Sequence, residues 1–258
     1  MIWGLNREFT STSTINCILT RIERNRADFT GCVETDSRPL FPYISHSDLG
    51  PPTTNDTSPI LSSGIDSLLS VVGFDSQLVS IFYSLTNLTC RLASPRENTV
   101  LATHQEFDLV MSLRYRLLSC RSTMIPSTKP EIIGDACRIG ALIYLRLICR
   151  NFPSFGQPYR ILLEKLKTHL TRLYKNLERL PIALVEQLLW LTFMGGLLEI
   201  NTQARMWFVS KLDQASSTLG LENWGDVKNA LEKFWWVGRI LDGASTSLWT
   251  KVMMIRDS

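Results

Sequence analysis

The chain has 258 residues, of which 45% are hydrophobic and 20% charged, and its formal net charge is +3. A chain of this length can bury most of its apolar surface, so we expect a globular protein of one large or two small domains. The charge is too small to indicate nucleic-acid binding, and no apolar run approaches the roughly 20 residues that span a bilayer.

The first predicted helix spans residues 14–29, where apolar side chains recur at helical intervals opposite a charged side. The pattern then ends, and residues 30–59 contain five prolines among many Ser, Thr and Asp residues. Such a composition predicts a loop. We therefore divide the chain into residues 1–59, an N-terminal helix plus a Pro/Ser/Thr-rich loop, and residues 60–258, a helical domain.

Three further helices are predicted before residue 120, each carrying an apolar stripe at helical spacing. Their expected ranges are 60–73, 75–93 and 104–119. Pro126 and Pro130 bracket a turn that follows them. The chain is therefore expected to continue as a succession of helices joined by short breaks.

Two helical stretches follow this turn. Residues 132–150 carry apolar side chains on most faces, which predicts a central helix. From Leu163 to Leu180 leucines recur at steps of three and four, a heptad seam of about two and a half repeats. A coiled coil normally needs more repeats, so packing within the domain is favoured over a homodimer. The outer face carries five cations, expected to be solvated, with partner binding as the alternative: Lys165, Lys167, Arg172, Lys175 and Arg179.

The stretch 181–198 is almost wholly apolar, so we expect it to form a helix at the centre of the fold. Trp190 and Phe193 should be almost fully buried there. The Gly195–Gly196 pair should let another helix approach closely, because glycine has no side-chain bulk. A phosphate-binding loop would need a Gly-x-x-x-x-Gly-Lys-Ser/Thr pattern, which is missing.

Helix boundaries are predicted at four further places. The signals are a cap at Asn201, an end at Gly220, a cap at Asn223 and a turn at residues 242–243 before the last helix. Strand-like alternation is rare throughout the chain. The predicted fold is therefore all-α: a single compact multi-helix domain of packed antiparallel helices.

Signatures of catalysis or metal binding are weak. The His104-Gln-Glu106 triplet is similar to the His-x-Glu of zinc deaminases, but the Pro-Cys-x-x-Cys partner is lacking. The six cysteines lie too far apart to form a Cys-x-x-Cys clip, and without a preceding signal peptide we expect free thiols in a reducing compartment. We therefore expect no enzyme and assign no catalytic, cofactor-binding or metal residue.

Residues 188–249 contain six of the seven tryptophans, each on a segment with helical spacing. Four features follow in order: a helix ending in Trp-Leu-x-Phe-x-Gly-Gly, an Arg-x-Trp-Phe helix, a Leu-Gly-Leu-x-x-Trp turn leading to Phe-Trp-Trp, and a terminal Leu-Trp. Together they resemble the C-terminal half of the fungal-specific transcription factor domain, the helical regulatory region downstream of binuclear zinc-cluster DNA-binding domains. The resemblance covers roughly residues 60–249 and includes the Ala-Leu-Ile-Tyr-Leu-Arg-Leu run at 141–147.

The resemblance implies an all-α regulatory domain in the nucleus of a fungus. Its partner would be a small-molecule effector or a protein of the transcription machinery. The family's zinc cluster, Cys-x-x-Cys-x6-Cys beside basic residues, has no counterpart in residues 1–60, so we expect no specific DNA binding by this chain and no cofactor. We expect either a regulatory fragment or truncated gene product, or a stand-alone relative that acts through other proteins.

The alternative is a helical protein-interaction scaffold unrelated to transcription. A scaffold of tandem hairpins should repeat with a fixed period, and no convincing 34-residue repeat is found. A closed globule with an apolar cavity would favour the regulator, and an open superhelical groove would favour the scaffold. For the regulator, we expect the aromatic-rich helices between Trp190 and Trp236 to wall the cavity.

Overall fold

The computed structural model describes residues 27–40, 59–93, 100–120, 125–149, 159–199 and 201–256. Within these ranges every regular element is a helix, which confirms the all-α prediction. After a helix at residues 27–35, the elements are α2 (Pro59–Val71), α3 (Ser76–Ala93), α4 (Val100–Ser119), α5 (Lys129–Ile148), α6 (Arg160–Tyr174), the 3-10 turn η1 (Leu177–Arg179), α7 (Ile182–Leu198), α8 (Thr202–Thr218), α9 (Trp224–Leu231) and α10 (Gly238–Arg256).

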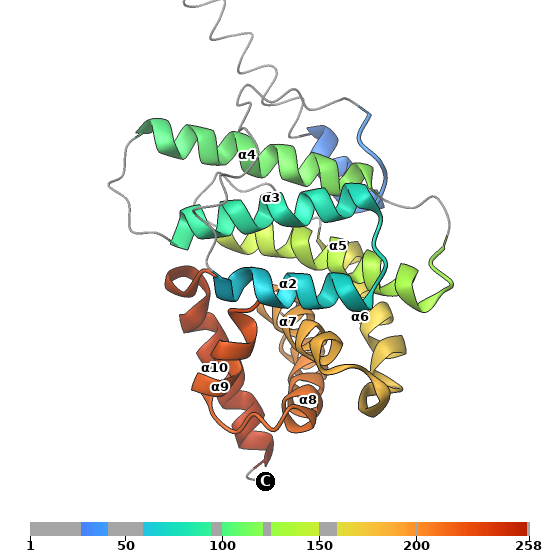
Figure 1. The fold of residues 1–258 in the computed structure, drawn as a ribbon, viewed down its shortest axis with the longest axis vertical. Coiled ribbons are helices and arrows are strands. Elements are labelled where there is room, and N and C mark those ends of the chain that lie inside the picture. The colour runs from blue at the N-terminus through green and yellow to red at the C-terminus, as the bar shows by residue number, and fades with distance from the viewer. Residues whose placement is uncertain are drawn as a thin grey trace, which may run out of the picture.

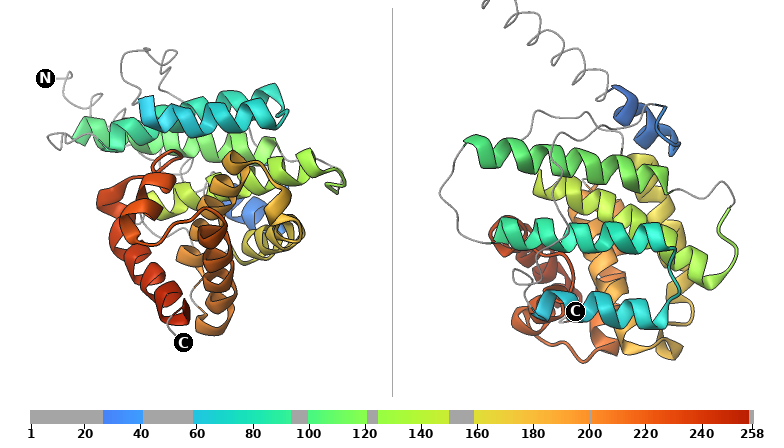
Figure 2. Two further views of the ribbon diagram at one scale, coloured as in Figure 1. Left: turned by 60° about the horizontal axis from the view of Figure 1, so that its bottom comes forward. Right: turned by 45° about the horizontal axis from the view of Figure 1, so that its top comes forward.

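The helices form two groups whose axes cross (Figure 1). Helices α2, α3, α4 and α5 lie side by side, and α7, α8 and α10 run at a steep angle to them. Figure 2 shows the same crossing from two further directions. No helix in the described part of the chain combines the length and apolarity needed to cross a membrane.

Helix α7 occupies the centre of the molecule, as predicted. It contacts α2, α5, α6, α8, α9 and α10, and both Trp190 and Phe193 are fully buried. A helix that is apolar on all sides is stable only when other helices surround it. Because α7 contacts elements from both ends of the chain, the fold differs from a tandem-repeat array, in which each unit contacts only its neighbours. The molecule is a closed globule.

The glycine pair at the end of α7 lets two helices approach its backbone. A Cβ on Gly195 would come within 2.3 Å of the Phe208 ring of α8, and a Cβ on Gly196 would come within 2.8 Å of Leu248 of α10. The predicted close approach is therefore confirmed. A Cβ on Gly140 of α5 would likewise come within 2.3 Å of a leucine of α7, so the second crossing of the core also depends on a glycine.

Two tryptophans connect α3 with α7. The Nε1 of Trp190 donates to the backbone oxygen of Trp235 at 3.0 Å, and the Nε1 of Trp235 donates to Thr86 Oγ1 at 3.1 Å. The two indole rings meet edge to face with centroids 5.4 Å apart. Trp235 and Trp236 lie in the turn between α9 and α10, so the prediction that every tryptophan of this region lies on a helical segment is wrong for this pair. In the turn, both indole N–H groups have acceptors, Thr86 for Trp235 and the carboxylate of residue 242 for Trp236.

The predicted capping residues are confirmed. Asn201 accepts from the backbone N of Ala204 at 3.0 Å, and Asn223 accepts from that of Asp226 at 3.1 Å. Gly220 ends α8 with φ of 67°, a left-handed conformation that favours glycine.

Several predicted boundaries are wrong. The helices expected to begin at residues 104 and 132 begin at Val100 and Lys129. The helix expected to end at residue 29 continues to residue 35, because Phe29, Cys32 and Val33 share one buried face. The leucine seam extends beyond α6, which ends at Tyr174. The last leucines of the seam lie in η1 and at the residue after it, and they are also buried. The turn expected at residues 242–243 lies inside α10, where the carboxylate of residue 242 accepts from a tryptophan and a lysine instead of closing a turn.

Parts of the sequence predictions lie outside the described residues. These are residues 14–26 of the first predicted helix and residues 41–58 of the predicted loop. The division at residue 59 stays a prediction. Residues 27–40, hereafter the N-terminal segment, pack onto the helical body through the buried Phe29 and Val33.

Candidate functional site

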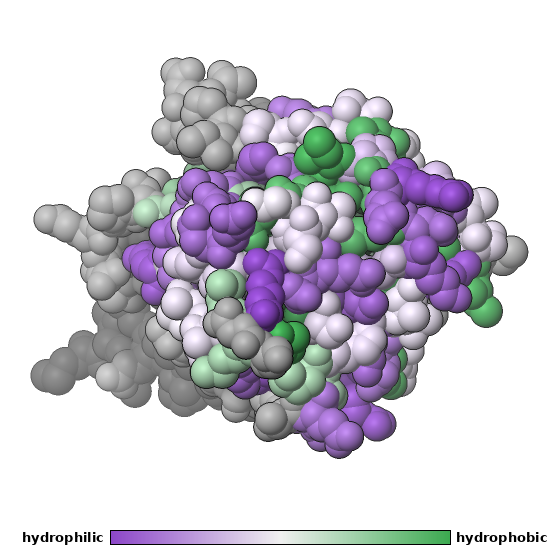
Figure 3. All heavy atoms as spheres, turned by 90° about the horizontal axis from the view of Figure 1, so that it is seen from below, coloured by the Kyte–Doolittle hydropathy of each residue, from purple (hydrophilic) through white to green (hydrophobic). Residues whose placement is uncertain are grey.

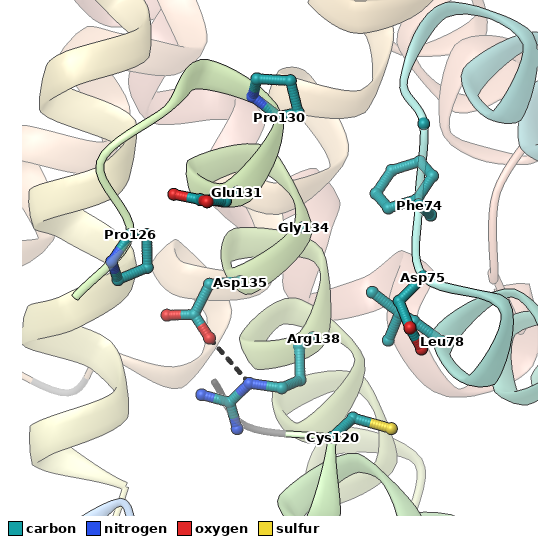
Figure 4. Close-up of a pocket in the computed structure, with 11 residues that line it drawn as sticks. Phe74, Asp75, Leu78, Cys120, Pro126, Pro130, Glu131, Gly134, Asp135 and Arg138 are labelled. Atoms are coloured by element: carbon teal, nitrogen blue, oxygen red, sulfur yellow. Dashed lines mark hydrogen bonds and ion pairs between the residues drawn. The ribbon is translucent and has the colours of Figure 1, made fainter. Parts of the chain in front are cut away.

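A pocket of about 210 Å³ lies where the turn between α2 and α3 faces the start of α5 (Figure 4). Its apolar lining residues are Phe74, Leu78, Pro126 and Pro130, its charged lining residues are Asp75, Glu131, Asp135 and Arg138, and Gly73, Gly134 and Cys120 complete the lining. This volume is more than ten times the roughly 10–15 Å³ that a cavity needs to hold one water. The pocket is therefore sized for a small molecule.

Local sequence signals fix both edges of the pocket. Thr128 and Glu131 form a capping box at the start of α5, in which Glu131 accepts from the backbone N of Ser127 and Thr128 at 2.9 and 3.0 Å. These backbone hydrogen bonds hold the pKa of Glu131 below its usual range. On the opposite edge, Asp75 accepts from the backbone N of Gln77 at 2.8 Å and starts α3. Two well-defined helix starts therefore hold the pocket walls in place.

A buried ion-pair network lies against the pocket. Arg138, only 2% exposed, donates from Nε to Asp135 at 2.7 Å and from Nη2 to Asp36 at 3.1 Å. Lys165 of α6 also donates to Asp36, and the Nε2 of His169 lies 2.9 Å from Asp135. The network thus connects α5, α6 and the N-terminal segment, and two of its members line the pocket.

The network stabilises the charged form of Asp135. Burial alone would raise the pKa of this carboxyl. The hydrogen bond from His169 and the charge of Arg138 outweigh burial, so the pKa of Asp135 lies well below its usual range. Asp135 therefore stays ionised at every physiological pH.

One nitrogen of the network has no acceptor. Among the described residues, the buried Nη1 of Arg138 has no hydrogen-bond partner. An unsatisfied buried donor costs about 1–3 kcal/mol, and a charged one costs more. Because Arg138 lines the pocket, an oxygen atom of a bound molecule is the natural acceptor for this nitrogen.

The cations of the α6 outer face, predicted to be solvated, take part in contacts within the protein. Lys165 pairs with Asp36, Lys167 lies 5.4 Å from the centroid of the Trp207 ring, and Arg172 donates to the backbone oxygen of Pro126 at 3.2 Å. Lys175 and Arg179 are exposed. Arg172 is exposed as well, so the predicted solvated face is confirmed for three of the five cations. It is wrong for Lys165 and Lys167, which are only partly exposed because the N-terminal segment and α8 contact them.

The aromatic-rich sequence predicts a cavity between Trp190 and Trp236. The rings in this region pack against one another: Trp190 meets Trp235, and Phe193 meets Trp224 and Trp236 with centroids 6.2 and 6.3 Å away. The pocket described above lies elsewhere, at the starts of α3 and α5. A sequence signal for it existed, namely an acid and a base at i and i+3, Asp135 and Arg138, on a helix whose residues are mostly buried.

Within the described ranges, no group of three or more His, Cys, Asp or Glu side chains is arranged to hold a metal ion. Burial raises the pKa of the Cys137 thiol to about 12, so this cysteine acts as a small apolar side chain.

The protein is an all-α globule built around one central helix, with a pocket at the starts of α3 and α5. Comparison with known protein families matches residues 5–258 to the fungal specific transcription factor domain. Because the match covers nearly the whole sequence, the chain belongs to this family, and the resemblance seen in its tryptophan-rich region is confirmed. Comparison with curated proteins and with solved structures gives no significant match. Family membership gives the chain a role in the regulation of transcription.

Proposed function

We propose that the chain is the regulatory domain of a fungal transcription factor and that a small-molecule effector binds in the pocket at the starts of α3 and α5. The observation that carries this proposal is the pairing of an apolar wall with the buried guanidinium of Arg138, one nitrogen of which lacks an acceptor in the described part of the chain. Effector pockets typically combine apolar walls with a few fixed polar groups. In this proposal the protein acts in the nucleus, catalyses no reaction and recognises no DNA sequence by itself.

The location of the pocket suggests how an effector would act. Its walls come from the α2–α3 turn, the end of α4, the α4–α5 connection and the start of α5. A molecule that contacts all of them would stabilise their present arrangement relative to any other. The gain in stability grows with the logarithm of ligand concentration over its dissociation constant.

A protein of the transcription machinery is the second candidate partner. Two large apolar side chains at helix ends favour it, Ile182 at the start of α7 (71% exposed) and Met254 near the end of α10 (64% exposed). On the face shown in Figure 3, hydrophobic residues form separate groups between hydrophilic ones. This surface therefore fits a modest contact better than a large apolar interface.

A thermal-shift screen of small fungal metabolites tests the proposal. A Cβ on Gly134 would lie 3.8 Å from the Phe74 ring, so Gly134→Ala is tolerated, whereas Gly134→Leu fills the pocket. We expect true effectors to raise the melting temperature of the wild type and of Gly134→Ala, but not that of Gly134→Leu. Hits that persist in Gly134→Leu would place the ligand elsewhere. A screen without hits, beside a specific protein partner in a pull-down, would favour the protein-interaction module.

A further inference from the structure

The three nitrogens of the Arg138 guanidinium lie in different surroundings. Its Nε donates to Asp135 on the same helix, and its Nη2 donates to Asp36 of the N-terminal segment. Its Nη1 is buried without an acceptor among the described residues, and the residue lines the pocket. One side chain therefore touches both the pocket and the N-terminal segment.

Asp36 joins the N-terminal segment to α5 and α6 by ion pairs. It is 1% exposed and receives hydrogen bonds from both Arg138 and Lys165. Its φ of 45° lies in the left-handed region, which aspartate enters more often than most residues other than glycine. The segment also packs through Phe29, whose ring lies 5.2 Å from the guanidinium carbon of Arg114 and 6.4 Å from the Tyr115 ring.

We propose that Arg138 couples occupancy of the pocket to docking of the N-terminal segment. An effector that presents an uncharged acceptor oxygen, such as a carbonyl or amide, to Nη1 strengthens docking, and an anion at the same place weakens it. This inference deepens the proposed function and rests on it for its biological meaning.

The sign of the coupling follows from the charges. Asp36 and Asp135 already neutralise Arg138, and Lys165 gives Asp36 a second cation. A neutral acceptor at Nη1 and the carboxylate of Asp36 both require the guanidinium to be ordered. Once one of them is bound, binding of the other costs less conformational entropy, so the two favour each other. An anion bound at Nη1 competes with Asp36 for the positive charge of Arg138, and it also repels the Asp36 carboxylate.

The same charges define the ligand class. The pocket wall also carries Asp75 and Glu131, which disfavour a net anion in the pocket. Its apolar side, formed around Phe74 and Leu78, requires an apolar body. The structure therefore favours a small, uncharged molecule with one exposed acceptor oxygen.

The coupling can be tested without knowing the effector. Gly134 lies four residues before Arg138, so their side chains share one face of α5. Gly134→Gln places an amide oxygen near the guanidinium, Gly134→Glu places a carboxylate of nearly equal shape, and Gly134→Leu provides a third side chain of similar size without an acceptor. Hydrogen exchange of residues 27–40 at neutral pH measures docking. Exchange within α7 reports global stability, and Asp36→Asn shows the released state.

Relative to Gly134→Leu, we expect Gly134→Gln to slow exchange of residues 27–40 by about threefold to tenfold, the range that the net contribution of one ordinary hydrogen bond implies. We expect Gly134→Glu to accelerate this exchange. Exchange in α7 should stay equal in all three variants. Arg138→Lys in the Gly134→Gln background should remove the protection. Equal exchange of residues 27–40 in the three variants, or shifts of the same sign for Gln and Glu, would overturn the coupling. A ligand screen without hits would instead refute the proposed effector site and leave this result standing.

Discussion

Replacing Trp190 tests how the core of this domain is held together. Its indole is fully buried on α7, faces the rings of Tyr144, Phe234 and Trp235, and donates one hydrogen bond to the backbone oxygen of Trp235 at 3.0 Å. Trp190→Phe keeps a ring in the same space and removes the donor. Trp190→Ala removes both.

The magnitudes separate the two variants. Truncation of a buried aromatic to alanine costs about 3–5 kcal/mol, a large part of the roughly 5–15 kcal/mol that stabilises a typical domain. Loss of the indole donor next to the buried oxygen of Trp235 costs about 1–3 kcal/mol. We therefore expect Trp190→Phe to fold with a measurable loss and Trp190→Ala to be insoluble or molten.

Urea unfolding followed by far-ultraviolet circular dichroism measures this loss without relying on tryptophan fluorescence. Trp207→Phe is the matched control, because Trp207 is only partly buried on α8, and it should lose less than about 1 kcal/mol. The reasoning would be refuted if Trp190→Phe were no less stable than Trp207→Phe, or if Trp190→Ala unfolded at the wild-type urea concentration.

Three further predictions concern the helix crossing, the ion-pair network and DNA. Gly195→Ala should lower the free energy of unfolding in urea by about 1–3 kcal/mol or more, because its Cβ would overlap the Phe208 ring. Gly134→Ala should be neutral or stabilising. Equal effects of the two substitutions would contradict the close helix crossing at Gly195. Because the folded-state pKa of Asp135 is depressed, its contribution to stability is present above about pH 4 and is lost as the pH falls further. The stability gap between Asp135→Asn and the wild type should therefore narrow from pH 5 to pH 2, and a constant gap would exclude this role. The purified chain should bind no duplex specifically, and any weak retention in a mobility-shift assay should vanish as salt rises; a salt-resistant, sequence-dependent shift would show otherwise.

The sequence was sufficient for the helical elements whose signals are local. The apolar stretch of α7 predicted its central position because a helix with no polar face must be covered on all sides. Caps at Asn201 and Asn223 were predictable because a side-chain acceptor and the backbone N it satisfies are three residues apart. The glycine pair of α7 also predicted a close crossing, although the partner helices could not be named.

The candidate site was missed because its parts are far apart in the sequence. Asp36 and Arg138 are separated by 102 residues, and the proline-rich surroundings of Asp36 predicted only a loop. The aromatic residues predicted a cavity where they instead fill one another's gaps, since large rings that meet edge to face leave little space. The i, i+3 pair of Asp135 and Arg138 on a buried helix was the local sign that a polar site lies there.

The most direct test of the effector pocket is a reporter assay in a fungal host. The chain is fused to an unrelated DNA-binding domain, and transcription from its target promoter is measured across nutrient conditions for the wild type, Gly134→Ala and Gly134→Leu at equal protein levels. We predict that the wild type and Gly134→Ala change reporter output with condition and that Gly134→Leu gives one constant output. A Gly134→Leu fusion that responds like the wild type would contradict regulation through this pocket.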